Sequence, residues 1–134
     1  MNDISATIGI GNLSDFKKNL DKNHYIAKRY NEELYDVKGI KTLDYKNDRQ
    51  SSYWLYPLIV DNREEFITKL KIKNIPTSVV HLGIDKNTIF GGKDSSLKNQ
   101  RFFDEHQIHL PINPSLTEEQ INYIIKTIKE WKKY

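Results

Sequence analysis

The sequence contains no cysteine among its 134 residues. This absence excludes disulfide bonds, thiolate nucleophiles and cysteine-based zinc sites. Apolar residues are also scarce, at 37% of the chain against 29% charged residues. Such a composition is lean but still globular rather than disordered, and the length suits one ordinary domain with one core. We therefore expect a single domain, 1–134, with an apolar face left over for a partner.

Long hydrophobic runs are missing as well. No stretch approaches the roughly 20 apolar residues that a membrane-spanning helix needs. The N-terminus does not have a basic region followed by an apolar run, so a secretory signal is not indicated. A cytoplasmic location is the expectation that follows, with no membrane partner.

Net charge is small too, at +3 from 21 basic and 18 acidic residues. That balance does not by itself argue for a nucleic-acid partner. One mild cluster of lysines stands at the end of the chain: Lys126, Lys129, Lys132 and Lys133. We interpret it as a cation-rich last helical turn, which favours the helix dipole, rather than as a nucleic-acid patch.

The first third of the chain is predicted to be helical. Its apolar residues recur at intervals of three and four, which places them on one stripe of a helix from about Asp15 to Asp36. A shorter helix is expected before it, with Gly9 and Gly11 leaving room for close packing or a bend. The stripe consists of Leu13, Phe16, Leu20, Asn23, Ala27, Tyr30 and Leu34.

The middle of the chain is predicted to be strand, helix and strand. Ser52–Val60 is rich in aromatic and branched residues and is apolar on both faces, so we expect a strand covered on both sides. Pro57 indicates that one edge of this strand lacks a partner locally. Asp61 and Glu64 form a capping-box pattern that begins a helix. The second strand is predicted at Thr77–Leu82.

The last third begins with a loop over residues 83–95. A short helix is expected from Leu97 to His106 with Phe102 and Phe103 facing inward, followed by a strand at Gln107–Leu110. Thr117 and Gln120 make a second capping box, which begins a helix that runs to about Lys132. Its apolar face consists of Ile121, Ile124, Ile125, Ile128 and Trp131.

Together these elements predict an α+β domain. A small sheet of about three strands is packed with a long N-terminal helix and a C-terminal helix. The N-terminal helical region covers 1–36 and the α+β body covers 37–134.

Motifs for chemistry are incomplete. Residues 90–94 read Phe-Gly-Gly-Lys-Asp, which has neither the spacing nor the Ser or Thr of a phosphate-binding P-loop. We interpret them as a glycine turn in an exposed loop. His106 and His109 are three residues apart, but no carboxylate completes a metal site, and surface histidines are the favoured interpretation. The motifs and patterns of the sequence alone indicate an α+β domain and do not indicate a function.

Four segments nevertheless resemble one family, in that family's order. They are Met1–Leu13 (MNDISATIGIGNL), Ile26–Leu34 (IAKRYNEEL), Trp54–Val60 with Arg63, Phe66 and Asn74–Thr77, and Leu110–Ile121 (LPINPSLTEEQI). The sequence is similar to the C-terminal portion of the DegT/DnrJ/EryC1/StrS family of sugar aminotransferases. The resemblance implies the small domain of a fold-type I aminotransferase that transfers an amino group to a keto-sugar nucleotide, in pathways such as polysaccharide biosynthesis.

The resemblance also implies what this chain does not supply. In the family, the Schiff-base lysine of pyridoxal phosphate, the aspartate on its pyridine nitrogen and the phosphate-binding segment all lie upstream of the region matched here. Transamination requires that lysine as covalent anchor and as base. We therefore expect no catalytic residue, no cofactor-binding residue and no metal site in this chain. The expected partners are a cofactor domain or a homodimer partner, and a nucleotide-sugar ligand.

A substrate surface is the one site that the resemblance places here. One subgroup of the family reads H-x-R-x-D-x-x-x-x-F after the second strand, and this chain has His81, Asp85 and Phe90 in that spacing, with Gly83 in place of the arginine. Aromatic faces stack on bases and sugars, which adds Trp54 and Tyr56. Strand alternation offers a competing interpretation in which Trp54 and Tyr56 belong to the core.

Three functions remain open at this point. The first is the small domain of a nucleotide-sugar aminotransferase, inactive alone. The second is a non-catalytic module of the same fold that binds a sugar nucleotide or a protein partner. The third is a small nucleic-acid-binding protein, which would bind generic DNA or RNA with strong salt dependence.

Overall fold

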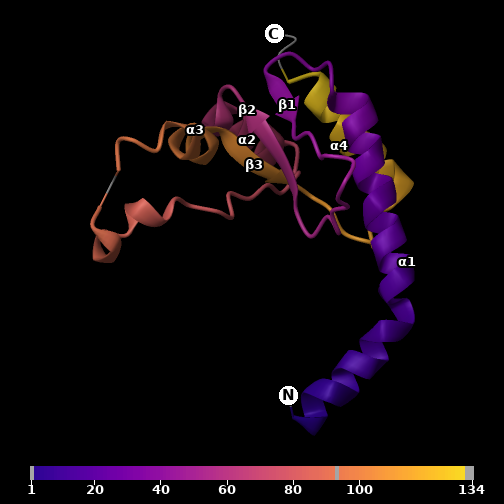
Figure 1. Ribbon diagram of the computed structural model, residues 1–134. Helices are drawn as coiled ribbons and strands as arrows, with labels where there is room; N and C mark the ends of the chain where they lie inside the picture. Colours follow the sequence, from indigo (N-terminus) through magenta and orange to yellow (C-terminus); the bar gives the residue numbers. More distant parts are fainter. Residues whose placement is uncertain (1, 93, 132–134) are drawn as a thin grey trace.

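A computed structural model describes residues 2–92 and 94–131. Figure 1 shows a small sheet with helices around it, from which α1 and the segment before α3 extend outward. The helices are α1 (Asp3–Leu34), α2 (Arg63–Ile72), α3 (Lys98–His106) and α4 (Glu118–Lys129). The strands are β1 (Ile40–Thr42), β2 (Tyr56–Val60) and β3 (Gln107–Leu110), and two 3-10 turns cover Ile84–Lys86 and Thr88–Phe90. The α+β class and a sheet of three strands agree with the expectation, although β1 stands in place of the strand predicted at Thr77–Leu82.

The two helices predicted for the first third are one continuous helix. α1 begins at Asp3, where the Asn2 side chain accepts a hydrogen bond from the Ser5 N–H at 2.8 Å. The helix passes through Gly9 and Gly11 without interruption, because glycine weakens a helix by only about 1 kcal/mol and does not forbid it. After α1 ends, Gly39 adopts a φ of 78°, which turns the chain into β1.

Only the second half of α1 is packed within the chain. Its buried residues are Ile26, Ala27, Tyr30 and Leu34, and ion pairs tie this half to α4. Lys22 lies 2.8 Å from Glu118, and Lys129 lies 3.0 Å from Glu33. The first half extends away from the sheet (Figure 1). Four large apolar side chains there are 59–71% exposed: Ile4, Ile8, Ile10 and Leu13.

The sheet is antiparallel in the order β1-β2-β3. β2 is central, pairing Leu58 with Thr42 of β1 on one side and with Ile108 of β3 on the other. Pro57 is tolerated because the β1 pairing ends at that Thr42–Leu58 pair, one residue before the proline would need a partner. The local gap predicted from Pro57 is therefore present. The predicted strand itself is shorter, since β2 begins at Tyr56 rather than at Ser52.

Helix α4 completes the core, and its capping residues and apolar face are those predicted from the sequence. The Thr117–Gln120 capping box is formed, and the five predicted apolar residues from Ile121 to Trp131 are buried. The helix ends at Lys129, while the predicted end at Lys132 and the lysine at 133 lie outside the described residues. The described part of the chain contains no helix with both the length and the apolar character to cross a membrane.

Three local predictions are wrong. The cap of α2 is Asn62 rather than Asp61, because the Asn62 amide donates to the Glu65 carboxylate at 2.9 Å while its oxygen accepts from the Glu65 N–H. Thr77–Leu82 is not a strand, since only Ser78 pairs with β3, through an isolated bridge to His109. Phe102 is exposed and Phe103 is half-buried, and the buried residue of α3 is Asp104.

Candidate functional site

The exposed surface beside the start of β2 brings together three aromatic rings. The Trp54 indole lies edge-to-face with the His81 imidazole, with ring centroids 6.4 Å apart. His81 in turn lies edge-to-face with His109 of β3 at 5.8 Å. Trp54 is 73% exposed and His81 is exposed, whereas His109 is 3% exposed. We name Trp54, His81 and His109 the aromatic triplet. Two of its members were sequence candidates.

Tyr56, the third candidate near this place, belongs to the core. It is 2% exposed and its hydroxyl donates to the Asn31 side-chain oxygen at 2.6 Å. Burial raises the pKa of the Tyr56 phenol far above its ordinary value, so the group stays neutral and fixed. The core interpretation is thus correct for Tyr56 and wrong for Trp54, which strand alternation would have placed on the same face.

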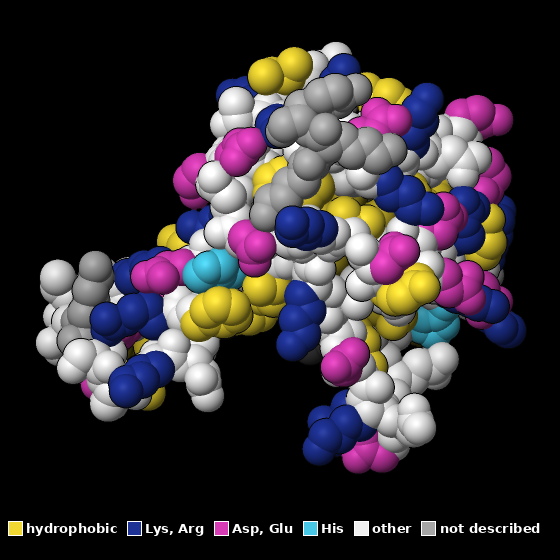
Figure 2. Space-filling model, turned by 90° about the horizontal axis from the view of Figure 1, so that it is seen from above, with side chains coloured by type: hydrophobic (Ala, Val, Ile, Leu, Met, Phe, Trp, Pro, Cys, Tyr) yellow, Lys and Arg dark blue, Asp and Glu magenta, His cyan; other side chains and the backbone are white. Residues whose placement is uncertain are grey.

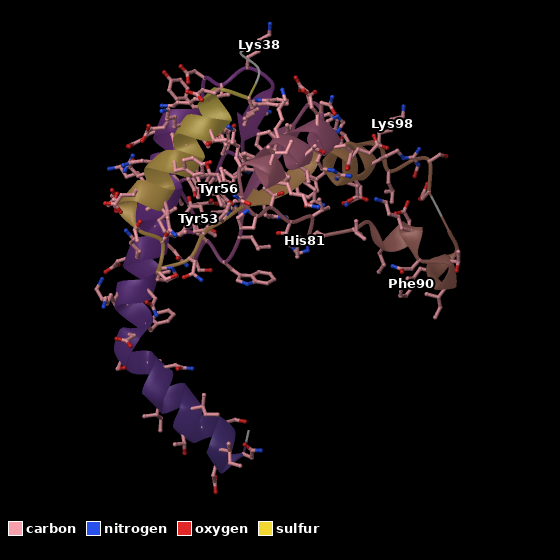
Figure 3. The ribbon with its side chains drawn as sticks, turned by 180° about the vertical axis from the view of Figure 1, so that it is seen from behind. Lys38, Tyr53, Tyr56, His81, Phe90 and Lys98 are labelled. Carbon is pink, nitrogen blue, oxygen red and sulfur yellow. The ribbon has the colours of Figure 1, made fainter. Side chains whose placement is uncertain are left out.

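Asp85 and Phe90 are not part of the aromatic triplet. They lie on the two 3-10 turns of the segment that extends away from the sheet, and Figure 3 shows Phe90 at its far end, well separated from His81. Asp85 accepts a hydrogen bond from the Asp94 N–H at 3.3 Å, which ties the segment to itself. The Phe90 ring is 62% exposed. The five predicted residues therefore separate into one pair, one core residue and two distant positions.

Residues outside the prediction hold His81 in place. The Gln107 amide, from β3, donates a hydrogen bond to the His81 carbonyl. The Arg63 guanidinium, from α2, donates to the carbonyls of Asp104 and Gln107, linking α2 to the same corner. Gln107 is fully buried. No local sequence signal indicates these roles, because each bond joins segments about 26 or more positions apart.

The absence of a side chain at position 83 has a structural explanation in this chain. The residue is buried, and a Cβ added to it would overlap the Asp104 carboxylate and lie 2.7 Å from an oxygen of Asp85. Asp104 is itself 3% exposed and accepts from the Gln100 amide at 2.9 Å. Beside Gly83, where the family subgroup carries an arginine, the carboxylates of Asp104 and Asp85 fill the space and would have to move to admit a side chain.

His109 is buried, which corrects its interpretation as a surface histidine. Its Nδ1 lies 3.1 Å from the Ser78 carbonyl oxygen, which only accepts, so Nδ1 carries the proton. Burial lowers the pKa of His109, the Ser78 carbonyl raises it and nearby His81 lowers it. The balance is a neutral ring at neutral pH. His106 contacts Phe102 and not His109.

Residues 2–92 and 94–131 contain no cluster of metal-binding side chains. No three histidine or carboxylate side chains gather there in a way that could hold a metal ion. Gly91 and Gly92 adopt φ values of 95° and 87°, as expected for a glycine turn in an exposed loop. The lysine at 93 lies outside the described residues. Figure 2 shows acidic and basic side chains mixed over the body of the domain, which does not favour a nucleic-acid surface on that face.

The described residues do not fit pyridoxal phosphate. A Schiff-base lysine must be desolvated or paired so that its amine reacts. The cavity beside Lys86 has about 120 Å³, and Lys86 there faces the Asp104 carboxylate at 3.9 Å. The larger groove between α2 and α4, about 500 Å³, is lined by Lys73 and Lys126, which are exposed, and by half-buried Lys69, whose ammonium already pairs with the Glu65 carboxylate and donates to the Trp131 carbonyl, each at 2.9 Å. Neither place combines a desolvated lysine with the rest of a cofactor site.

Comparisons with known proteins agree on one family. The family model of the DegT/DnrJ/EryC1/StrS aminotransferases matches residues 1–129. An uncharacterized protein of Methanocaldococcus jannaschii, MJ1066, is 34% identical over 97% of this chain and 36% of its own length. The spore coat polysaccharide biosynthesis protein SpsC of Bacillus subtilis is 28% identical over 97% of this chain and 36% of its own length.

Solved structures similar to this chain are also sugar aminotransferases. The sugar aminotransferase CalS13 from Micromonospora echinospora superposes with a TM-score of 0.92 and is 28% identical over 97% of this chain and 35% of its own. The putative sugar aminotransferase Spr1654 from Streptococcus pneumoniae, solved in a PLP-form, has a TM-score of 0.83 and is 27% identical over 98% of this chain and 36% of its own. The chain thus spans about a third of the length of the proteins it matches.

Proposed function

The chain belongs to the DegT/DnrJ/EryC1/StrS aminotransferase family, and on that premise we propose that it is the C-terminal small domain of a nucleotide-sugar aminotransferase. In the whole enzyme it closes the substrate side of a site whose cofactor is held by another domain. The observation that carries the proposal is the match in fold over nearly the whole chain to about a third of a sugar aminotransferase.

The first half of α1 supports a missing protein partner. Monomeric proteins rarely expose several large apolar side chains close together, and such a group marks an interaction surface. Ile4 and Ile8, four residues apart, lie on one face of α1, Ile10 and Leu13 project from other sides of the same half of the helix, and all four are exposed. We assign this surface, the α1 face, to contact with the cofactor domain or with a second protomer.

Gly9 and Gly11 support the same assignment. Each weakens the helix by about 0.5–1 kcal/mol relative to alanine. Within residues 2–92 and 94–131, nothing lies within 4 Å of a Cβ built at either position, so packing among these residues does not require the glycines. A backbone from another domain that approaches α1 closely accounts for one of these glycines, because residues two apart point to opposite sides of a helix.

The substrate side of the domain is the aromatic triplet. Trp54 offers an exposed ring face on which a base or sugar stacks, and His81 beside it offers ring nitrogens to hydroxyl or phosphate oxygens. His109 lies on the buried side of His81, and the His81 ring packs against it. Asp85 and Phe90 remain candidates for the same ligand only if the segment that carries them moves toward the triplet.

A titration with dTDP-glucose, a nucleotide sugar with both a base and a hexose, tests the substrate side. Amide shifts in ¹H–¹⁵N spectra of the 134-residue chain are expected to cluster at residues 53–56 and 81–85. Binding should be weak, because the cofactor domain would supply the remaining contacts. Shifts elsewhere, or none at millimolar ligand, would remove this placement. Tight binding with a complete set of contacts would instead favour an independent binding module.

A further inference from the structure

The residue before Trp54 has a backbone conformation that side chains rarely adopt. Tyr53 has a φ of 49°, and among the described residues the only other non-glycine with a positive φ is Asn74. Asn74 follows the end of α2, where a left-handed asparagine is common. A tyrosine in this region is uncommon, because its Cβ crowds the following carbonyl oxygen. Tyr53 therefore needs an explanation of its own.

The left-handed turn exchanges the places of Tyr53 and Trp54. Side chains alternate along β2, and Tyr56, Leu58 and Val60 are buried on one face. Continuing that alternation backwards would bury Trp54 beside Tyr56. Instead the Tyr53 ring stacks on Tyr56, with centroids 6.3 Å apart, and Trp54 is exposed. Figure 3 shows Tyr53 and Tyr56 close together below the sheet.

Contacts from several segments maintain the turn. The Tyr53 N–H donates to the Ser51 hydroxyl at 3.1 Å, and its carbonyl accepts from the Asn23 amide at 3.4 Å. The ring lies edge-to-face with Tyr45 at 5.6 Å and with His24 at 5.8 Å. The same arrangement leaves the Asn23 side-chain oxygen buried without a partner among the described residues. A strained residue that is fixed from so many sides is typical of functional sites.

We propose that Tyr53 is a positioning residue of the candidate site. Its left-handed backbone holds the Trp54 ring outside the core and beside His81, where the ring stacks on a flat group of the ligand. What Trp54 binds rests on the proposed function. How Trp54 comes to be outside the core does not, because that follows from the left-handed conformation of Tyr53 together with the bend of the chain at Trp54 and Leu55.

Two substitutions of similar size separate backbone conformation from the loss of the ring. Tyr53→Asn and Tyr53→Val both remove the aromatic ring, but asparagine tolerates the left-handed region and a β-branched valine does not. The chain has two tryptophans, and Trp131 is 4% exposed. Acrylamide quenching of tryptophan fluorescence therefore reports chiefly on Trp54.

We expect Y53N to retain the quenchable fraction of the unsubstituted chain and Y53V to lose much of it. The affinity for dTDP-glucose should be about tenfold lower in Y53V than in Y53N, since left-handed backbone disfavours the valine by that order. Equal quenching in the two variants would overturn the proposal. A quenching difference without any dTDP-glucose binding by the unsubstituted chain would leave the positioning role standing and refute the proposed ligand.

Circular dichroism checks that both variants fold. If loss of the ring unfolds them, Y53H, which keeps a ring and tolerates positive φ, is compared with Y53I in the same two assays. Quenching in Y53H that matches the unsubstituted chain, with reduced quenching in Y53I, supports the proposal. Identical behaviour of those two variants would contradict it.

Discussion

Tyr56 and Trp54 stand two residues apart, yet one is buried and the other exposed, and a pair of substitutions can test the different roles that we propose for them. Tyr56→Phe removes one hydroxyl and keeps the ring volume, so no cavity is created. The lost group is the buried donor that bonds Asn31 at 2.6 Å. Removing one partner of a part-buried hydrogen bond costs about 1–2 kcal/mol, because the acceptor that remains has lost its partner. For a chain of this length, that corresponds to a fall in Tm of about 3–6 °C.

Trp54→Ala should behave in the opposite way. Because the indole is 73% exposed, its removal is expected to change the free energy of unfolding by no more than about 0.5 kcal/mol. Its effect should appear in ligand binding, where a lost ring-stacking contact of about 1 kcal/mol reduces affinity for dTDP-glucose by about fivefold. Y56F should leave that affinity unchanged.

Urea unfolding followed by circular dichroism, together with the dTDP-glucose titration, measures both quantities on both variants. The comparison needs no absolute calibration, because each variant serves as the control for the other. If W54A lowers the urea midpoint more than Y56F does, Trp54 contributes to the core and the reasoning about the left-handed turn is wrong. If Y56F alone weakens ligand binding, the substrate surface has been placed on the wrong residue.

Three further predictions follow from single residues. Burial lowers the folded-state pKa of His109, so the unfolded chain takes up the proton first, and the free energy of unfolding falls as pH drops below about 6.5, the ordinary pKa of histidine. His109→Asn should reduce that fall. Urea midpoints at pH 7.5 and pH 5.5 that differ by the same amount in the variant and in the unsubstituted chain would contradict this. Gly83→Ala should destabilise the chain by about 1–3 kcal/mol through overlap with the Asp104 carboxylate. The double variant with Asp104→Ala should recover part of that loss. An unchanged Tm of Gly83→Ala in a thermal melt would show that the space beside position 83 can accept a side chain. The purified chain should show no pyridoxal phosphate absorbance, because the described lysines do not form a desolvated anchor, and a stoichiometric adduct on one lysine after borohydride reduction would refute this.

The sequence predicts the elements whose signals are local. The Thr117–Gln120 capping box and the apolar stripe behind it lie within one helix, and α4 forms as the pattern indicates. The strand predicted at Gln107–Leu110, ahead of the turn that Pro111 and Pro114 bound, likewise forms with those bounds. β1, by contrast, has only three residues, and no period is visible in so short a segment. It exists because the edge of β2 offers it a partner.

The candidate site was less predictable, for a physical reason. Trp54 faces outward where the chain bends at Trp54 and Leu55, and where Tyr53 stacks on Tyr56 in a left-handed conformation that no rule for tyrosine predicts. His81 meets His109 only after Ser78 has bridged to β3, a contact 31 positions apart in the sequence. Periodicity assigns faces within an element, and it contains no information about such contacts between elements. Asp85 and Phe90 were included through family resemblance, and the structure places them on a separate segment.

The most direct test of the central claim is hydrogen exchange along α1. In the 134-residue chain, amides of residues 3–16 should exchange rapidly, because an exposed helical segment without tertiary packing is marginal in water. Amides of residues 26–34, which pack on the core, should be protected. The measurement is then repeated after fusing this chain behind the part of MJ1066 that it does not match, the other two thirds of that protein.

If the chain is the small domain of an aminotransferase, exchange at residues 3–16 should slow at least tenfold in the fusion, while residues 26–34 change little. A fusion in which Ile8→Asp restores rapid exchange would identify the α1 face as the contact. Unchanged rapid exchange at residues 3–16, in a fusion whose other domain is folded, would contradict the account.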